Sequence, residues 1–181
     1  MKKTTLVNLI GAPGAGKSIL GYDLTSKLRK DYVSAELVTE AAKDHVYEGK
    51  TADQMDQLEI FAEQYKRVKR LNGKVDLIIT DSPLFLSAYY AIKGNYHKSF
   101  IQYAIDVANE FDNVNFFVHR NHKYDERGRH QNEEQSNTVH EELKQLMKDY
   151  SINYYPIVAG EQSCDIMINS IKIHQGLQMN C

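Results

Sequence analysis

Cysteine is nearly absent from this chain of 181 residues. Its two cysteines, Cys164 and Cys181, cannot form a disulfide framework, which favours a reducing, cytoplasmic compartment. No apolar run is long enough to cross a bilayer, and residues 1–3 lead directly into an expected strand without a signal-peptide pattern. The formal net charge is only -2, so no overall positive field marks a nucleic-acid-binding protein.

The composition is that of an ordinary globular protein, with 42% hydrophobic and 25% charged residues. We therefore expect one domain over residues 1–181. Apolar strand-like segments alternate with helical patterns, which predicts an α/β fold with a parallel sheet and helices on both of its faces. The expected strands are residues 4–10, 33–39, 75–80, 114–118 and 154–158.

Helix starts are predicted from polar residues that precede apolar periodicity. Thr51, Ser99 and Thr138 each begin a Thr/Ser-x-x-Gln/Glu pattern typical of a capping box. Ser163 is the expected cap of the last helix, and Asn72-Gly73 is the expected end of the helix that follows Thr51.

The strongest motif is G-x-x-x-x-G-K-[ST], between an expected strand and an expected helix. In this loop, backbone N–H groups and the helix N-terminus bind phosphate, while Lys17 reaches the β- and γ-phosphates and Ser18 ligates Mg²⁺. We therefore predict ATP and Mg²⁺ as ligands. The expected nucleotide-binding residues are Gly11, Ala12, Pro13, Gly14, Ala15, Gly16, Lys17, Ser18 and Ile19.

A second motif follows the third expected strand, where Leu77-Ile78-Ile79-Thr80 leads into Asp81. An apolar strand ending in aspartate is the Walker B arrangement, so Asp81 is expected to hold Mg²⁺ with Ser18 or to serve as a base. The alternative is that Asp81 caps the next helix, with Pro83 in its first turn.

Glu40 ends the second expected strand and is predicted to face the acceptor side of the cleft, where it can orient or deprotonate a hydroxyl. Asp44 and His45 are alternatives for that role. The competing interpretation is that Glu40 lies at the N-terminus of the next helix, where the helix dipole stabilises its negative charge.

Residues 119–137 contain almost no apolar side chain, which predicts a functional lid rather than an inert surface loop. Arg120, Arg127 and Arg129 are the candidate catalytic arginines, since a closing lid can bring them to the transferring phosphoryl group. Surface ion pairs with Glu133 and Glu134 are the alternative. Histidines in this stretch lack a second ligand pair at zinc spacing.

The P-loop, Val-Thr-Glu at 38–40, Thr-Asp-Ser-Pro at 80–83 and Gly-Arg-x-Gln-x-Glu-Glu at 128–134 together resemble a family of small P-loop proteins. These proteins are common in bacteriophage genomes, are labelled ATPases or nucleotide kinases, and are similar to ribosylnicotinamide, nucleoside and nucleotide kinases. The resemblance implies a three-layer P-loop kinase fold with strand order 2-3-1-4-5 and an arginine-bearing lid.

The same resemblance implies transfer of the γ-phosphoryl group of ATP to a nucleoside- or nucleotide-like acceptor, in the host cytoplasm if the protein is phage-encoded. Some relatives suggest a different acceptor, a hydroxymethylated base or an end in DNA. A P-loop regulatory ATPase is the alternative from another class. The Asp-Arg pair that follows the third strand in many nucleoside and thymidylate kinases is replaced by Asp81-Ser82-Pro83. A monomer or a homodimer is expected.

Overall fold

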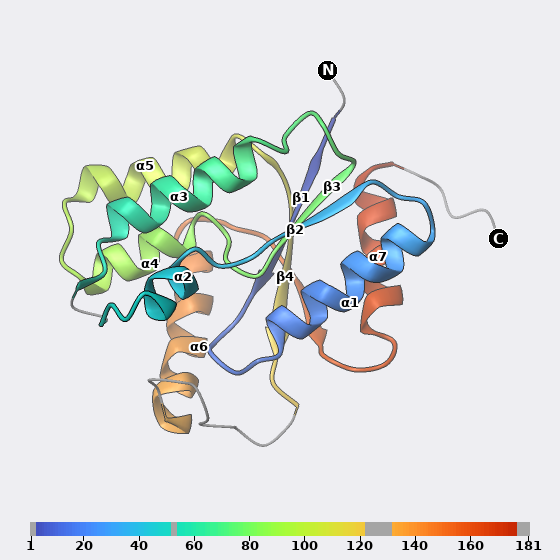
Figure 1. Cartoon of the computed structure of the whole chain (residues 1–181). Helices are drawn as coiled ribbons and strands as arrows, with labels where there is room; N and C mark the ends of the chain where they lie inside the picture. The colour runs from blue at the N-terminus through green and yellow to red at the C-terminus, as the bar shows by residue number, and fades with distance from the viewer. Residues whose placement is uncertain (1–2, 52–53, 122–131, 177–181) are drawn as a thin grey trace.

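The computed structural model describes residues 3–51, 54–121 and 132–176. Its centre is a five-stranded parallel sheet in the order β2-β3-β1-β4-β5 (Figure 1). The strands are β1 (Thr5–Ile10), β2 (Ala35–Val38), β3 (Leu77–Thr80), β4 (Asp112–His119) and β5 (Tyr155–Val158). All five expected strands and the order implied by the resemblance are thereby confirmed.

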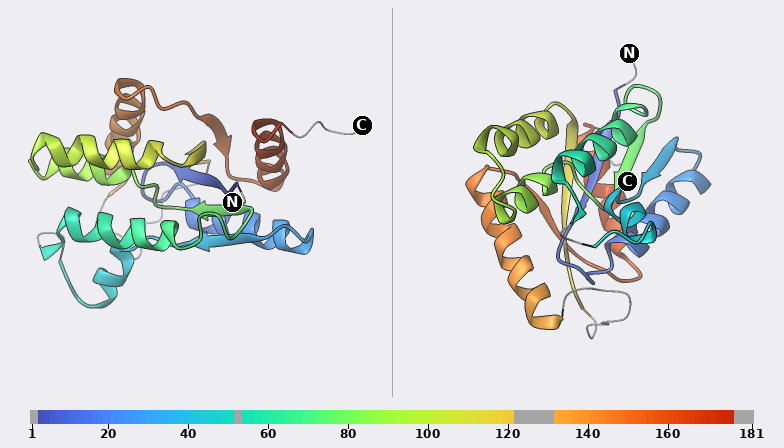
Figure 2. Two further views of the ribbon diagram at one scale, coloured as in Figure 1. Left: turned by 90° about the horizontal axis from the view of Figure 1, so that it is seen from above. Right: turned by 60° about the vertical axis from the view of Figure 1, so that its left-hand side comes forward.

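The helices lie on both faces of the sheet, and Figure 2 shows the three layers from above. Helices α1 and α7 cover one face, and α3, α4, α5 and α6 cover the other (Figures 1 and 2). The bounds are α1 (Lys17–Lys30), α2 (Ala42–Tyr47), α3 (Gln57–Lys69), α4 (Leu86–Lys93), α5 (Lys98–Asn109), α6 (Glu133–Asp149) and α7 (Ser163–His174).

Each face of the sheet has its own apolar core, because the strands alternate their side chains between the two faces. Leu9 and Phe116 pack with Leu24 of α1 and Met167 of α7 on one side. Ile10 and Phe117 belong to the cluster on the other side, with residues of α3–α6. The central strand β1 is buried along its whole length, as expected for a strand covered on both faces.

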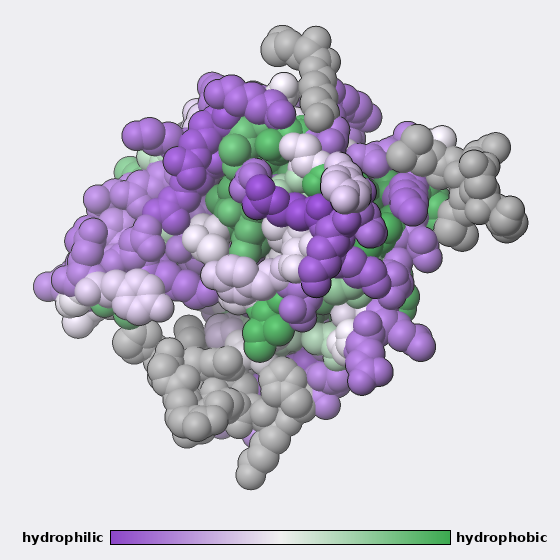
Figure 3. Space-filling view, turned by 45° about the vertical axis from the view of Figure 1, so that its right-hand side comes forward, coloured by the Kyte–Doolittle hydropathy of each residue, from purple (hydrophilic) through white to green (hydrophobic). Residues whose placement is uncertain are grey.

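The outer surface over α1 and α7 is largely hydrophilic, with hydrophobic areas between the polar side chains (Figure 3). Exposed apolar residues on these helices include Ile19 and Ile173. Among the described residues, no helix combines the length and the apolarity that a bilayer crossing requires.

Four predicted helix starts are wrong. Helix α3 is capped by Asp56 instead of Thr51, because the Asp56 carboxylate accepts a hydrogen bond from the Leu58 N–H. His97, two residues before Ser99, caps α5 by accepting from the Ser99 N–H.

Helix α6 begins at Glu133, five residues before Thr138, and its N-cap is a capping box formed by Asn132 and Gln135. Thr138 lies inside the helix and donates its hydroxyl to the Glu134 carbonyl. The more upstream pattern prevails because every extra turn adds backbone hydrogen bonds. Ser163, the expected cap of the last helix, is instead the first residue of α7, and Gln162 is at the N-cap. The Ser163 hydroxyl donates a hydrogen bond to the Gly160 carbonyl oxygen.

Candidate active site

The phosphate-binding loop joins β1 to α1, as the sequence predicts. Gly14 and Gly16 adopt φ angles of 81° and 89°, which only glycine adopts without strain. A Cβ on Gly11 would lie 2.7 Å from the Val118 carbonyl oxygen of β4, so this glycine allows the loop to approach the neighbouring strand. The loop therefore needs glycine at these positions for its backbone path as well as for ligand access.

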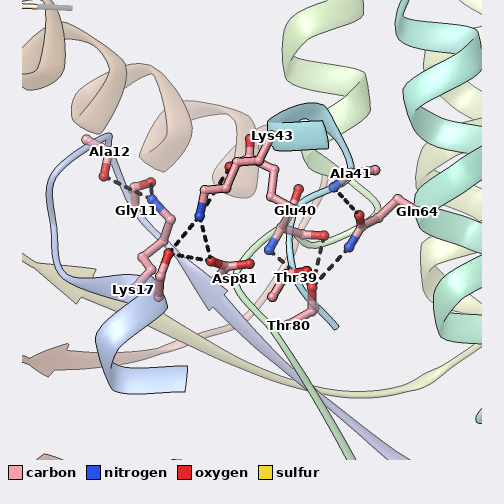
Figure 4. Close-up of polar contacts among 12 residues, drawn as sticks. Gly11, Ala12, Lys17, Thr39, Glu40, Ala41, Lys43, Gln64, Thr80 and Asp81 are labelled. Atoms are coloured by element: carbon pink, nitrogen blue, oxygen red, sulfur yellow. Dashed lines mark hydrogen bonds and ion pairs between the residues drawn. The ribbon is translucent and has the colours of Figure 1, made fainter. Parts of the chain in front are cut away.

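Lys17 and Ser18 form the first turn of α1 at the mouth of this loop. The Lys17 ammonium donates hydrogen bonds to the carbonyl oxygens of Gly11 (2.7 Å) and Ala12 (3.0 Å), and so lies across the loop (Figure 4). A cation at this position, beside the partially positive helix N-terminus, favours an anion.

Asp81 follows β3 directly and is only 4% exposed. Its Oδ2 accepts a 2.5 Å hydrogen bond from the Ser18 hydroxyl. Its Oδ1 is buried and has no hydrogen-bond partner among the described residues. Phe85 is the residue at the N-cap of α4, so the alternative in which Asp81 caps the next helix is wrong.

Lys43 is a component of this site that the sequence motifs do not predict. It belongs to α2, and its ammonium lies 3.0 Å from the Ser18 hydroxyl and 3.4 Å from Asp81 Oδ2 (Figure 4). The Glu40 carboxylate is 4.0 Å from the same ammonium. The spacing of Glu40 and Lys43 could have indicated this, because residues three apart lie on the same side of a helical turn. A helix that follows β2 then brings Lys43 back over the end of that strand.

Glu40 follows β2 and is half-buried. Burial raises the pKa of its carboxyl group, and the negative charge of Asp81 adds to this rise, while the Lys17 and Lys43 ammonium groups oppose it. Nearby, burial and the Glu40 charge raise the pKa of Tyr90 to about 12, so this phenol keeps its proton at neutral pH.

Gln64 of α3 holds the ends of β2 and β3 together. Its side-chain oxygen accepts from the Ala41 N–H at 2.9 Å, and its amide nitrogen donates to the Thr80 hydroxyl at 3.2 Å (Figure 4). Gln64 is 2% exposed and lies on the same helix face as Phe61 and Val68. A polar residue inside an apolar stripe is the signal that would have identified it.

Arg120 directly follows β4, and its guanidinium donates to Glu133 (3.1 Å) and Asn137 (2.8 Å) in α6. The alternative interpretation, a surface ion pair with Glu133, is thus present for Arg120. Arg127 and Arg129, with most of the predicted lid, lie outside the described residues. The described part of the segment 119–137 comprises the last residue of β4, residues 120–121, Asn132 and the start of α6.

A cavity of about 270 Å³ lies between the phosphate-binding loop and α6. Ser136 anchors the helix there, because its hydroxyl donates to the Pro13 carbonyl at 2.8 Å. His119 and His140 line the same cavity with ring centroids 5.2 Å apart. Burial lowers the pKa of both imidazoles, and Lys144 adds to the effect, so both rings are neutral at neutral pH.

Comparisons with solved structures show a P-loop kinase fold. The chain matches a NadR protein solved in complex with NR with a TM-score of 0.71 and 16% identity, over 98% of this chain and 53% of that one. It therefore spans about half the length of that NadR chain. Thymidylate kinase from Ehrlichia chaffeensis matches with a TM-score of 0.62 and 14% identity, over 94% and 98% of the two chains.

Thymidylate kinase from Candida albicans matches with a TM-score of 0.59 and 12% identity, over 97% of this chain and 94% of that chain. At identities this low, the similarity shows a shared fold only. No curated protein sequence matches the chain at a significant level. A family model described as "AAA domain" matches residues 6–162, which is most of the chain and includes every described residue of the candidate site. The chain therefore belongs to this AAA domain family, AAA_28, and has the fold of the P-loop nucleotide kinases.

Proposed function

We propose that this protein is an ATP-dependent kinase that transfers the γ-phosphoryl group of ATP to a nucleoside- or nucleotide-like acceptor. The observation that carries the proposal is the position of Glu40 and Lys43 beside the Ser18–Asp81 pair. A carboxylate and an ammonium from the β2–α2 segment thus lie beside the phosphate-binding loop, where a phosphotransferase needs groups for its acceptor.

The donor side fits ATP and Mg²⁺. Ser18 and Asp81 offer the hard oxygen ligands that Mg²⁺ prefers, and the buried Asp81 Oδ1 has a free acceptor position among the described residues. When bound, Mg²⁺ would neutralise part of the negative charge of the phosphate groups. Backbone N–H groups of the loop and the Lys17 ammonium bind the remaining phosphate oxygens.

On the acceptor side, Glu40 accepts the proton of the attacking hydroxyl. The acceptor oxygen forms a bond to the γ-phosphorus, the bond from that phosphorus to the β–γ bridging oxygen breaks, and ADP leaves. Lys43 contacts the transferring phosphoryl group and offsets its negative charge. A phosphate acceptor needs no deprotonation, and Glu40 then only orients it.

Arg120, Arg127 and Arg129 are proposed to complete the charge neutralisation when the segment 119–137 closes over the donor. The anchoring of Arg120 by Glu133 and Asn137 supports this, because it fixes one guanidinium group beside the cavity at the phosphate-binding loop. Exclusion of water by such closure would limit hydrolysis of ATP.

The acceptor class rests on the fold likeness. Two of the similar structures are thymidylate kinases and one is a NadR protein in complex with NR, and these support a nucleotide or a nucleoside as acceptor. A hydroxymethylated base or an end in DNA is the second acceptor class to test.

The decisive experiment measures ADP release and product mass with ATP alone, then with nucleosides, nucleotides, hydroxymethylated DNA and DNA ends. Acceptor-dependent ADP release with a phosphorylated product is expected. The Lys17→Ala variant should abolish it, whereas Lys172→Ala, an exposed change on α7, should not. ATP hydrolysis that no acceptor stimulates, and that leaves no phosphorylated product, would instead identify a regulatory ATPase.

A further inference from the structure

A second cluster of ligating side chains lies outside the phosphate-binding loop, where α2 meets the start of α3. One nitrogen of His45 and one carboxylate oxygen each of Glu59 and Glu63 lie within 4.8 Å of one another. Glu59 and Glu63 are four residues apart on α3, so they project from one face of that helix. His45 approaches this face from α2.

His45 is the unusual member of this cluster, because it is only 4% exposed. Its Nε2 is buried without a hydrogen-bond partner among the described residues, and it faces Glu63 Oε2 at 3.5 Å. A buried ring nitrogen normally has a partner, since leaving it unsatisfied costs about 1–3 kcal/mol. A metal ion coordinated by Nε2 and the carboxylates would satisfy it.

The cluster also carries excess negative charge. Glu48, Glu59 and Glu63 surround His45, and Lys50 is a cation within 4 Å of two of these carboxylates. Arg67 lies 4.0 Å from Glu63 but is paired more closely with Asp44. A divalent cation would therefore meet three carboxylates whose charge is only partly neutralised.

Lys50 determines how such a cation binds. Its ammonium lies 2.7 Å from His45 Nδ1, which must accept this hydrogen bond, so in the neutral ring the proton is on Nε2. A metal ion on Nε2 requires that proton to move to Nδ1, and Lys50 must then leave. Glu48 Oε2, 3.7 Å from Nδ1, is available to accept the relocated N–H.

We propose that His45, Glu59 and Glu63 form a binding site for a divalent transition-metal ion, with Lys50 as the cation that the metal displaces. One imidazole and two carboxylates suit Zn²⁺, Co²⁺ or Mn²⁺, whereas Mg²⁺ and Ca²⁺ prefer oxygen ligands alone. The bound ion links α2 to α3. Because α2 carries Lys43, this link holds the acceptor side of the candidate active site.

The test is a titration of the full-length protein with Co²⁺, followed by its visible absorption, in an Asp81→Asn background that removes the carboxylate beside the phosphate-binding loop. We expect saturable binding with the spectrum of a nitrogen- and oxygen-ligated ion. Adding His45→Gln or Glu63→Gln should weaken binding at least about tenfold, since even outer-shell partners contribute about 10–100-fold. Lys50→Met should tighten binding by about two- to fivefold, the size of one exposed ion pair.

His174→Gln is the matched control, because His174 also contacts a carboxylate, Asp112, at 2.9 Å on another part of the surface. It should leave Co²⁺ binding unchanged. Circular dichroism identifies any variant that fails to fold. If His45→Gln does not fold, Glu63→Gln alone provides the test. Equal Co²⁺ affinity in the folded ligand variants, or weaker binding in Lys50→Met, would overturn the proposal. Neither outcome bears on the kinase function.

Discussion

At the scale of single residues, the site combines groups from three separate segments of the chain. The phosphate-binding loop supplies Lys17 and Ser18, the end of β3 supplies Asp81, and the segment after β2 supplies Glu40 and Lys43. The two carboxylates have different surroundings: Asp81 accepts a hydrogen bond from the Ser18 hydroxyl and lies 3.4 Å from the Lys43 ammonium, whereas desolvation raises the pKa of Glu40. Such a difference suits one carboxylate for a cation and the other for a proton.

Lys43→Met is expected to lower kcat about 10- to 100-fold, because a hydrogen bond to a charged group contributes about 1.5–3 kcal/mol. The KM for ATP should change less, since the contact of Lys43 with the phosphoryl group strengthens while that group is transferred. Steady-state kinetics with the best acceptor measure both constants. Lys43→Arg should recover part of the rate, and Lys30→Met, an exposed change at the end of α1, is the control. An unchanged kcat in Lys43→Met would remove this lysine from the mechanism.

Ionisation of Glu40 should determine how kcat falls at low pH when the acceptor is a hydroxyl. Glu40 can act as a base only when it is ionised. Because its pKa is raised, kcat should begin to fall on acidification at a pH above the ordinary pKa of a glutamate. Glu40→Gln should lower kcat by about 10²–10⁴ and abolish this limb of the profile. The measurement is kcat against pH for both proteins. A variant that keeps the same acid limb would assign the base to another group.

At the scale of elements, polar contacts connect helices to the strand ends that carry the site. Gln64 of α3 joins the ends of β2 and β3, and Ser136 of α6 joins the phosphate-binding loop. Both residues are 2% exposed, so each hydrogen bond is shielded from water. The helices therefore position the loops from which the proposed catalytic residues project.

The start of α6 offers a direct test of which residue caps this helix. Asn132→Ala should lower the free energy of unfolding by about 1 kcal/mol, because it removes the acceptor for the Gln135 N–H. Thr138→Ala should change it by less than about 0.5 kcal/mol, since Thr138 lies inside the helix. Urea denaturation of both variants measures the difference. A larger loss for Thr138→Ala would place the helix start where the sequence pattern had suggested.

At the scale of the whole molecule, parallel strands end at one edge of the sheet, and the loops from β1, β2 and β3 meet there. This is where open α/β sheets bind ligands, at the carboxyl ends of their strands. The strand order places β1 between β3 and β4, so the phosphate-binding loop lies between Asp81 and Arg120. A ligand there contacts several segments at once and stabilises the whole fold.

ATP with Mg²⁺ should therefore raise the melting temperature. At a concentration 100 times its Kd, a ligand adds about 2.7 kcal/mol to stability, which corresponds to roughly 5–10 °C for a domain of this size. Differential scanning fluorimetry measures the shift. Lys17→Ala should reduce it strongly, and Lys172→Ala should keep it. The absence of a shift with every nucleoside triphosphate would contradict nucleotide binding.

The sequence alone determined the strands, the phosphate-binding loop and the candidate residues Lys17, Ser18, Asp81 and Glu40, because these depend on local patterns of apolar, glycine and charged residues. It did not reveal Lys43, Gln64 or Ser136, whose contacts join residues 25, 16 and 123 positions apart. It also misplaced four helix caps, since neighbouring polar residues offer competing starts and local spacing does not choose between them. Only the tertiary structure decided these points, because packing determines which polar groups lose water and must find partners inside the protein.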